Sequence, residues 1–139
     1  MQEFITNDKY RIKGNVSFAG LSYSYLDEEH GEVLEFKFLE KSKTIYLRFY
    51  SSIVSFRHRE VFGSKDYINV EGDTNSNDKL YVVQNSEYLE NLNEISGGSV
   101  SDWFSPLTHY VVFDYELEYY FDIVTNSEPE IVIKYSSKN

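Results

Sequence analysis

The stretch VLEFKFLEKSKTIYLRFY, residues 33–50, decides the fold. Glu40-Lys41-Ser42-Lys43 in its middle is suited to a turn. Apolar and polar residues alternate on both sides of that turn, and the apolar set is Leu34, Phe36, Phe38, Ile45, Leu47 and Phe49. Alternation with a period of two places one set of side chains on one face of a strand. The stretch therefore predicts a long antiparallel hairpin with one apolar face.

Strand patterns extend outward from this hairpin in both directions. Alternation predicts further strands in residues 10–18, 21–25, 53–62, 67–70, 109–113, 119–123 and 131–135. Gly14 is suited to a bulge, and residues 71–78, the most polar stretch, predict an exposed loop. That loop is too short to separate two domains, and no internal repeat is visible. We expect residues 1–139 to form a single domain.

One segment, near residues 86–96, has the helical period instead. Ser86 is suited to cap its N-terminus, and Gly97-Gly98 is suited to end it. The stripe expected to face the core consists of Tyr88, Leu89, Leu92 and Ile95. Residues 101–106 predict a short turn or a single helical turn. Together these elements predict an α+β fold. We expect a mostly antiparallel curved sheet that forms a half-open barrel around this main helix. A closed small barrel is the alternative.

The composition excludes several classes of protein. With no Cys, the chain has no disulfides, zinc ribbons, iron–sulfur clusters or thiol catalysis. The first eight residues lack the basic and apolar regions of a signal peptide. The longest uncharged run, residues 103–113, is far shorter than the roughly 20 residues that span a bilayer. We expect a cytoplasmic protein without a membrane partner.

Charge is distributed unevenly along the chain, whose net charge is −10. Residues 1–65 carry ten Lys and Arg against nine Asp and Glu, whereas residues 66–139 carry three against fourteen. No basic residue lies between Lys79 and Lys134. Such acidity disfavours binding to a polyphosphate, so we expect no nucleic-acid partner. The asymmetry indicates either a solvated acidic face or a docking surface for a cationic partner.

Three histidines are the candidates for metal or acid–base chemistry. His30 with Glu32, and His58 with Glu60, each have the spacing of one strand face, but no third ligand is spaced to complete a metal site. His109 opens an otherwise apolar strand, and we expect it to be half-buried and hydrogen-bonded to backbone. We therefore expect no metal and no cofactor.

A nucleophile pair of His109 with Ser105 or Thr108 is conceivable. Nothing around these residues resembles a nucleophile elbow or an oxyanion loop. We expect that the protein is not an enzyme and has no catalytic residue.

Residues 114–122 interleave tyrosines with carboxylates. A hydrophobic core alone does not require this composition. Carboxylates and phenol rings suit the recognition of Lys and Arg through ion pairs and cation–π contacts. Trp and Tyr are also enriched among residues that dominate protein interfaces. The predicted partner-binding residues are Asp102, Trp103, Asp114, Tyr115, Glu116, Glu118, Tyr119, Tyr120 and Asp122.

Four stretches within residues 80–133 carry a resemblance: 83–90 (VQNSEYLE), 108–113 (THYVVF), 121–124 (FDIV) and 128–131 (EPEI). They resemble stretches of small bacterial proteins, some of which are found near toxin and immunity genes. A small, acidic, Cys-free α+β chain with an aromatic acidic surface also resembles the bacterial immunity proteins of contact-dependent growth inhibition and other polymorphic toxin systems. The resemblance implies a cognate toxin as partner, in many such systems a nuclease with a basic cleft.

These observations together predict an immunity or inhibitor protein that neutralises a basic toxin through an acidic, Tyr-rich surface. Two alternatives stay open. One is a small β-rich binding module, which could be homo-oligomeric through its sheet edges. The other is a carrier of a small apolar ligand, because a curved sheet lined with Phe and Tyr could enclose such a molecule. The oligomeric state is not predicted.

Overall fold

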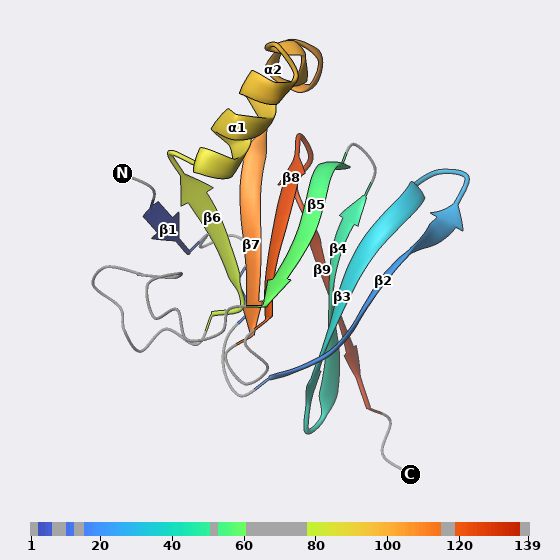
Figure 1. The fold of residues 1–139 in the computed structure, drawn as a ribbon. Helices are drawn as coiled ribbons and strands as arrows, with labels where there is room; N and C mark the ends of the chain where they lie inside the picture. Colours follow the sequence, from blue (N-terminus) through green and yellow to red (C-terminus); the bar gives the residue numbers. More distant parts are fainter. Residues whose placement is uncertain are drawn as a thin grey trace.

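The computed structural model describes residues 3–6, 11–12, 16–50, 53–60, 78–114 and 119–136 (Figure 1). The predicted strand 67–70, most of the predicted loop 71–78 and Gly14 lie outside the described residues. In chain order the elements are β1 (Glu3–Ile5), β2 (Ser17–Asp27), β3 (Gly31–Glu40), β4 (Lys43–Tyr50), β5 (Ile53–Glu60), β6 (Leu80–Gln84), α1 (Glu87–Ile95), α2 (Ser99–Phe104), β7 (Thr108–Asp114), β8 (Tyr119–Thr125) and β9 (Glu130–Tyr135).

The strands form two antiparallel sheets. One has the order β1-β6-β7-β8-β5 and the other β2-β3-β4-β9. The chain passes from the second sheet to the first after β4 and returns after β8. The α+β class with mostly antiparallel sheets is confirmed, although the sheets do not close into a barrel.

The hairpin predicted from residues 33–50 is confirmed as β3 and β4. Its pairing runs from Val33 opposite Tyr50 to Glu40 opposite Lys43. All six residues of the predicted apolar set are buried, and they form the core together with Leu80, Tyr110, Val112, Phe121 and Ile123 of the other sheet. The two sheets therefore pack face to face over this shared core.

The five-stranded sheet is also apolar on its other face. A second buried cluster there consists of Phe4, Tyr81, Val83, Val111, Phe113 and Tyr120. These residues alternate along their strands with those of the first core, as a period of two requires. Burial of the central strand β7 on both faces explains why residues 110–113 are continuously apolar.

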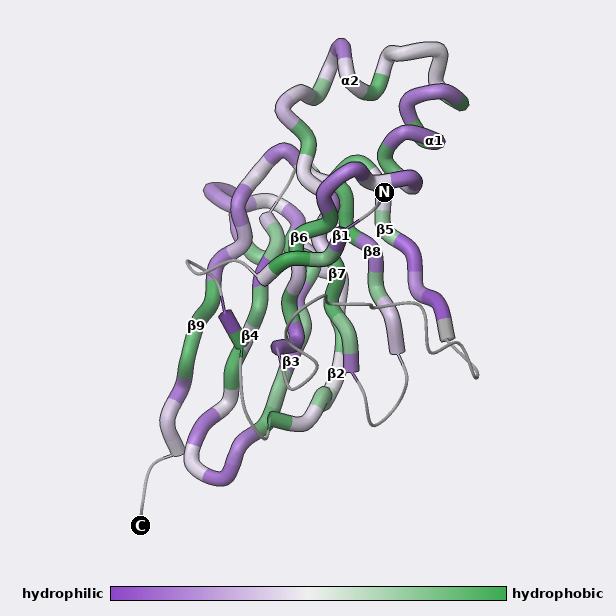
Figure 2. The backbone as a smooth tube through the Cα atoms, turned by 90° about the vertical axis from the view of Figure 1, so that its left-hand side faces the viewer, coloured by the Kyte–Doolittle hydropathy of each residue, from purple (hydrophilic) through white to green (hydrophobic). Residues whose placement is uncertain are grey.

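Helix α1 begins and ends where the sequence predicts. The Ser86 side chain accepts a hydrogen bond from the Leu89 backbone N–H, and both Gly97 and Gly98 have positive φ angles beyond the last turn. The helices stand at one end of the five-stranded sheet, and hydrophilic residues run along α1 (Figures 1 and 2). They are not enclosed by a curled sheet, because the core lies between two sheets instead.

Helix α1 contacts the sheet less closely than its pattern predicts. No residue of α1 or α2 is fully buried. Ile95 is 75% exposed, so the prediction that it faces the core is wrong. Neither helix in the described part of the chain is long and apolar enough to cross a bilayer.

Two leucines of the β3–β4 hairpin test the packing. Leu47 is fully buried and Leu39 is 44% exposed. We expect Leu47→Ala to lower the free energy of unfolding by about 3 kcal/mol, because it removes buried methyl groups and leaves a cavity. The matched Leu39→Ala change should cost less than about 1 kcal/mol. Urea unfolding of both variants measures the difference, and equal losses would contradict the two-sheet core.

Candidate functional site

A buried carboxylate organises the face of the five-stranded sheet that points away from the shared core. Asp122 of β8 is fully buried. Its Oδ1 accepts a hydrogen bond from Nε2 of His109 at 2.7 Å. Its Oδ2 accepts from Nε of Arg57 at 2.7 Å and forms an ion pair with Nη2 of Arg59 at 3.0 Å. Asp122 thus joins strands β5, β7 and β8 through side chains.

The same network continues into the N-terminus of α1. Oγ of Ser86 lies 2.6 Å from Nδ1 of His109. An ionised carboxylate only accepts hydrogen bonds, so Nε2 of His109 carries a proton and donates it to Asp122. Oγ of Ser86 in turn accepts from the Leu89 N–H at 3.0 Å. The residue that caps the helix is therefore itself held by the sheet.

The environment of His109 differs from the prediction. Its side chain is fully buried instead of half-buried. Both ring nitrogens contact side chains, those of Ser86 and Asp122, where a backbone partner was the expectation. The sequence pattern around His109 depends only on residues next to it in the chain, whereas its partners Ser86 and Asp122 come from other parts of the fold.

Tyr88 makes the second attachment of α1 to the sheet. The guanidinium of Arg57 lies 3.8 Å from the centroid of the Tyr88 ring, which also packs edge-on against His109 at 5.3 Å. Its hydroxyl forms a hydrogen bond with the hydroxyl of Ser55 on β5. Cation–π contact and hydrogen bonding together fix the first turn of α1 on β5 and β7.

The ionisation of Asp122 follows from these partners. Burial by itself raises the pKa of the carboxyl group. Hydrogen bonds from His109 and Arg57, with the positive charge of Arg59, outweigh burial and hold the pKa of Asp122 below its ordinary value. Asp122 is therefore ionised at neutral pH, although it has no contact with solvent.

Ser86, His109 and Asp122 are the residue types of a hydrolytic triad, and their order in space invites comparison with one. A nucleophile must reach its substrate, but all three side chains are buried. The Ser86 oxygen already serves as the helix cap. In this arrangement the three side chains attach a helix to a sheet.

Burial overturns part of the predicted set of partner-binding residues. The prediction that Asp114, Tyr120 and Asp122 lie on an exposed surface is wrong, because all three are buried. Asp114 pairs with Nζ of Lys79 at 3.2 Å, and the guanidinium of Arg59 lies over the Tyr120 ring. These carboxylates are already neutralised by basic side chains of the same chain, so they do not offer a binding surface.

Tyr119 and three further residues of the predicted partner-binding set have other positions. Tyr119 is half-buried, and its ring packs against Phe18 and Phe121. Tyr115, Glu116 and Glu118 lie outside the described residues.

The two helices carry the exposed part of the predicted site. Asp102 is exposed on α2, and Trp103 beside it is 81% exposed. Three glutamates of α1 are exposed as well and follow a helical spacing of three and four residues, so they form one stripe. We call the exposed acidic and apolar residues of both helices the helix-pair surface: Glu87, Glu90, Glu94, Ile95, Asp102, Trp103 and Phe104.

The remaining histidines have structural contacts. Nδ1 of His30 lies 2.9 Å from Oδ1 of Asp27 in the turn after β2, and this hydrogen bond raises the pKa of His30. The His58 ring stacks on Phe121 at 4.7 Å. Within the described residues no group of three His, Asp or Glu side chains could hold a metal ion.

Comparisons of this chain with protein-family models, with curated proteins and with solved structures find no match. Any functional assignment therefore depends on the geometry of the site. That geometry consists of an acidic and aromatic helix-pair surface attached to the sheet by a buried ionic network.

Removal of the Asp122 charge tests the network. We expect Asp122→Asn to lower the free energy of unfolding by about 3 kcal/mol, because it leaves two guanidinium groups without their buried counterion. Asp102→Asn makes the same change at an exposed position and should shift stability by less than about 0.5 kcal/mol. Chemical unfolding at neutral pH measures both variants, and similar values for the two would contradict a stabilising role of the Asp122 charge.

Acid titration gives a separate test of the same carboxylate. Because the folded-state pKa of Asp122 is lowered, its stabilisation is complete above the ordinary carboxyl pKa of about 4 and is lost as pH falls through the folded value. The stability difference between the wild type and Asp122→Asn should therefore shrink below about pH 4. Urea unfolding at a series of pH values measures it. A constant difference down to the acid limit would show that Asp122 is not the titrating group.

Proposed function

We propose that this protein binds and neutralises a basic protein partner through the helix-pair surface, as an inhibitor of the immunity type. The observation that carries the proposal is Trp103, 81% exposed on a helix pair whose charged residues are all acidic. Exposed tryptophan beside carboxylates suits a partner that supplies both an apolar pocket and basic side chains.

Electrostatics favours a cationic partner. The three glutamates of α1 and Asp102 face solvent, and neither helix contains a basic residue. Such a surface attracts positive charge over a distance of about 10 Å at 0.1 M salt and raises the association rate. A nuclease toxin has a basic cleft because it grips a polyanion, so it is the class of partner that fits best.

Exposed apolar side chains give the helix-pair surface binding energy that charge alone does not provide. Ile95 is exposed at the end of α1, and Trp103 and Phe104 are exposed at the end of α2. Large apolar groups exposed next to each other mark interaction sites on monomeric proteins. In a complex they would be the anchors, with the carboxylates around them setting specificity and rate.

The buried network prepares this surface for binding. Ser86 and Tyr88 attach the first turn of α1 to the sheet through His109, Arg57 and Ser55. A surface already fixed in its bound geometry loses less conformational entropy on association. The stability of the Asp122 network thus contributes to affinity without contact with the partner.

Capture with matched variants tests the proposed function. The tagged chain is used to capture proteins from the lysate of its source cells at about 0.1 M salt, a concentration at which charges still attract over about 10 Å. We expect a basic protein that is released at high salt and that is lost with Trp103→Ala or with the triple variant Glu90→Gln, Glu94→Gln, Asp102→Asn. The affinity should fall at least about tenfold, the equivalent of 1.4 kcal/mol, for either variant.

The matched control makes the same number of charge changes elsewhere. Glu28, Glu29 and Glu40 are exposed in and near the turns that flank β3. The variant Glu28→Gln, Glu29→Gln, Glu40→Gln should keep the partner. Equal loss with both triple variants would mean that net charge alone matters, and retention with both would rule out the helix-pair surface.

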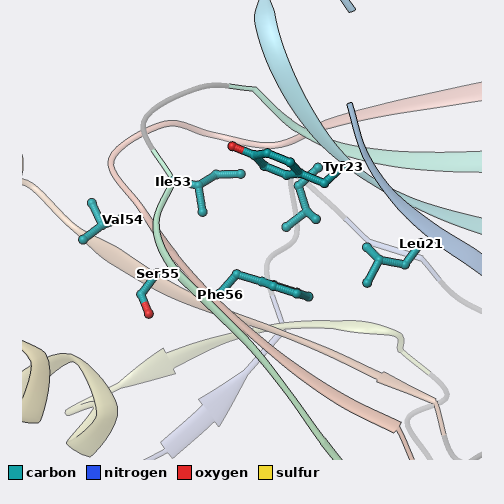
Figure 3. A pocket seen from close by; sticks show the side chains of 7 residues that line it. Leu21, Tyr23, Ile53, Val54, Ser55 and Phe56 are labelled. Carbon is teal, nitrogen blue, oxygen red and sulfur yellow. The ribbon is translucent and has the colours of Figure 1, made fainter. Parts of the chain in front are cut away.

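An apolar cleft favours a second candidate function, the carriage of a small apolar molecule. The cleft has a volume of about 510 Å³, within the size range of ligand sites, and is lined by Leu21, Tyr23, Leu34, Ile53, Val54, Ser55 and Phe56. Leu21 and Tyr23 of β2 face Ile53 and Phe56 of β5 across it (Figure 3).

Native mass spectrometry of the purified protein tests this second function. A carrier should retain a small molecule, seen as a discrete mass above that of the chain. The variant Phe56→Lys should lose that mass, because it places a charge in the cleft. A bare chain in every preparation would contradict carriage.

A further inference from the structure

We infer that β2 is a dimerisation strand, along which two copies of this chain pair antiparallel and join their four-stranded sheets into one. β2 is an end strand of its sheet and the longest strand described, with 11 residues. It carries no charged residue before Asp27 at its end. An end strand presents unpaired N–H and C=O groups, and a long uncharged one is a template for another strand.

The other three sheet edges in the described part of the chain are short or charged, whereas β2 is neither. β1 is only three residues long. β5 carries Arg57 and Arg59, and β9 carries Glu130 and Lys134. Short edges and charged side chains are the usual means by which natural sheets prevent edge pairing. β2 has only two register shifts, next to Ala19 and Leu26, and residues 20–25 between them pair regularly.

The side chains of β2 suit pairing with an identical strand. An antiparallel pair centred on Ser22 places Leu21 opposite Tyr23 of the second copy, and the reverse by symmetry. Aliphatic–aromatic cross-strand pairs of this kind stabilise a sheet. Both residues are exposed in the isolated chain, Tyr23 by 57%. The uncharged strand meets itself without repulsion between like charges.

The distribution of charge selects a second copy rather than an acidic or basic partner. β2 belongs to residues 1–65, where ten basic residues nearly balance nine acidic ones. The excess of eleven negative charges belongs to residues 66–139. Pairing through β2 brings together a segment of nearly balanced charge, and it leaves the helix-pair surface, which is on the other sheet, free in both copies.

The pairing also accounts for the open cleft. Leu21 and Tyr23 line the cleft from the inner side of β2, facing β5. In an antiparallel pair centred on Ser22, residues directly opposite each other point to the same face. The second copy therefore adds its own Leu21 and Tyr23 to the apolar wall, where the isolated chain exposes them to water.

The mass of the protein in solution tests this inference without any other partner. Sedimentation equilibrium of the wild type between about 1 and 200 µM should show a dimer of twice the chain mass, with a proportion that rises with concentration. Ser22→Lys places two ammonium groups on either side of the symmetry axis and should raise the dissociation constant at least about tenfold. Gln84→Lys adds the same charge at an exposed position of the other sheet and should dimerise like the wild type.

A monomeric wild type over the whole range, or a Ser22→Lys variant that dimerises as well as Gln84→Lys, would overturn the inference. Circular dichroism confirms that each variant is folded, and Ser24→Lys, on the same exposed face, is a second variant expected to act like Ser22→Lys. Dimerisation should strengthen with salt, because salt screens the repulsion between two acidic chains. Partner capture by the helix pair should weaken with salt, so the two interactions are distinguishable.

Discussion

The ion cluster at Asp122 is the constraint on which the arrangement of helices and sheet depends. A fully buried carboxylate is tolerated only when positive groups and hydrogen-bond donors surround it. Here the donors come from β5 and β7, and the chain of hydrogen bonds reaches the cap of α1 through Ser86. The helix has no fully buried residue, so ordinary burial contributes little to its position. Polar contacts determine how it stands on the sheet.

The same constraint separates the acidic residues of the chain into two groups with different roles. Asp114 and Asp122 are buried and neutralised by basic side chains of this chain. The carboxylates of the helix pair are exposed, and neither helix has a basic residue. The first group stabilises the fold, and the second is what a cationic partner would meet. An excess of acidic residues in a sequence therefore does not locate a binding surface until burial is known.

The local pattern of the chain predicts its elements well. Strict alternation determines β3 and β4, and the capping chemistry of Ser86 and Gly97-Gly98 determines α1, because both depend on neighbouring residues only. The division into two sheets depends on long-range pairing, such as β9 with β4, which no local pattern records. The burial of Asp122 could not be predicted for the same reason. Its partners Arg57 and His109 are distant in sequence, and strand register alone brings them to it. Asp102 and Trp103 are exposed as predicted, because α2 is short and stands clear of the sheet.

Amide hydrogen exchange of α1 tests most directly whether the buried network positions the helix pair. The relevant amides are those of the first turns, such as Glu90 N–H, which donates to the Ser86 carbonyl. With Asp122→Asn, we predict that protection falls by a larger factor in α1 than in β3 and β4, on the other sheet, whose amides lose only the protection that the lower global stability removes. Asp102→Asn should leave α1 unchanged. Loss of protection by the same factor throughout the protein, or unchanged protection in α1, would contradict the claim that Asp122 holds the binding surface in place.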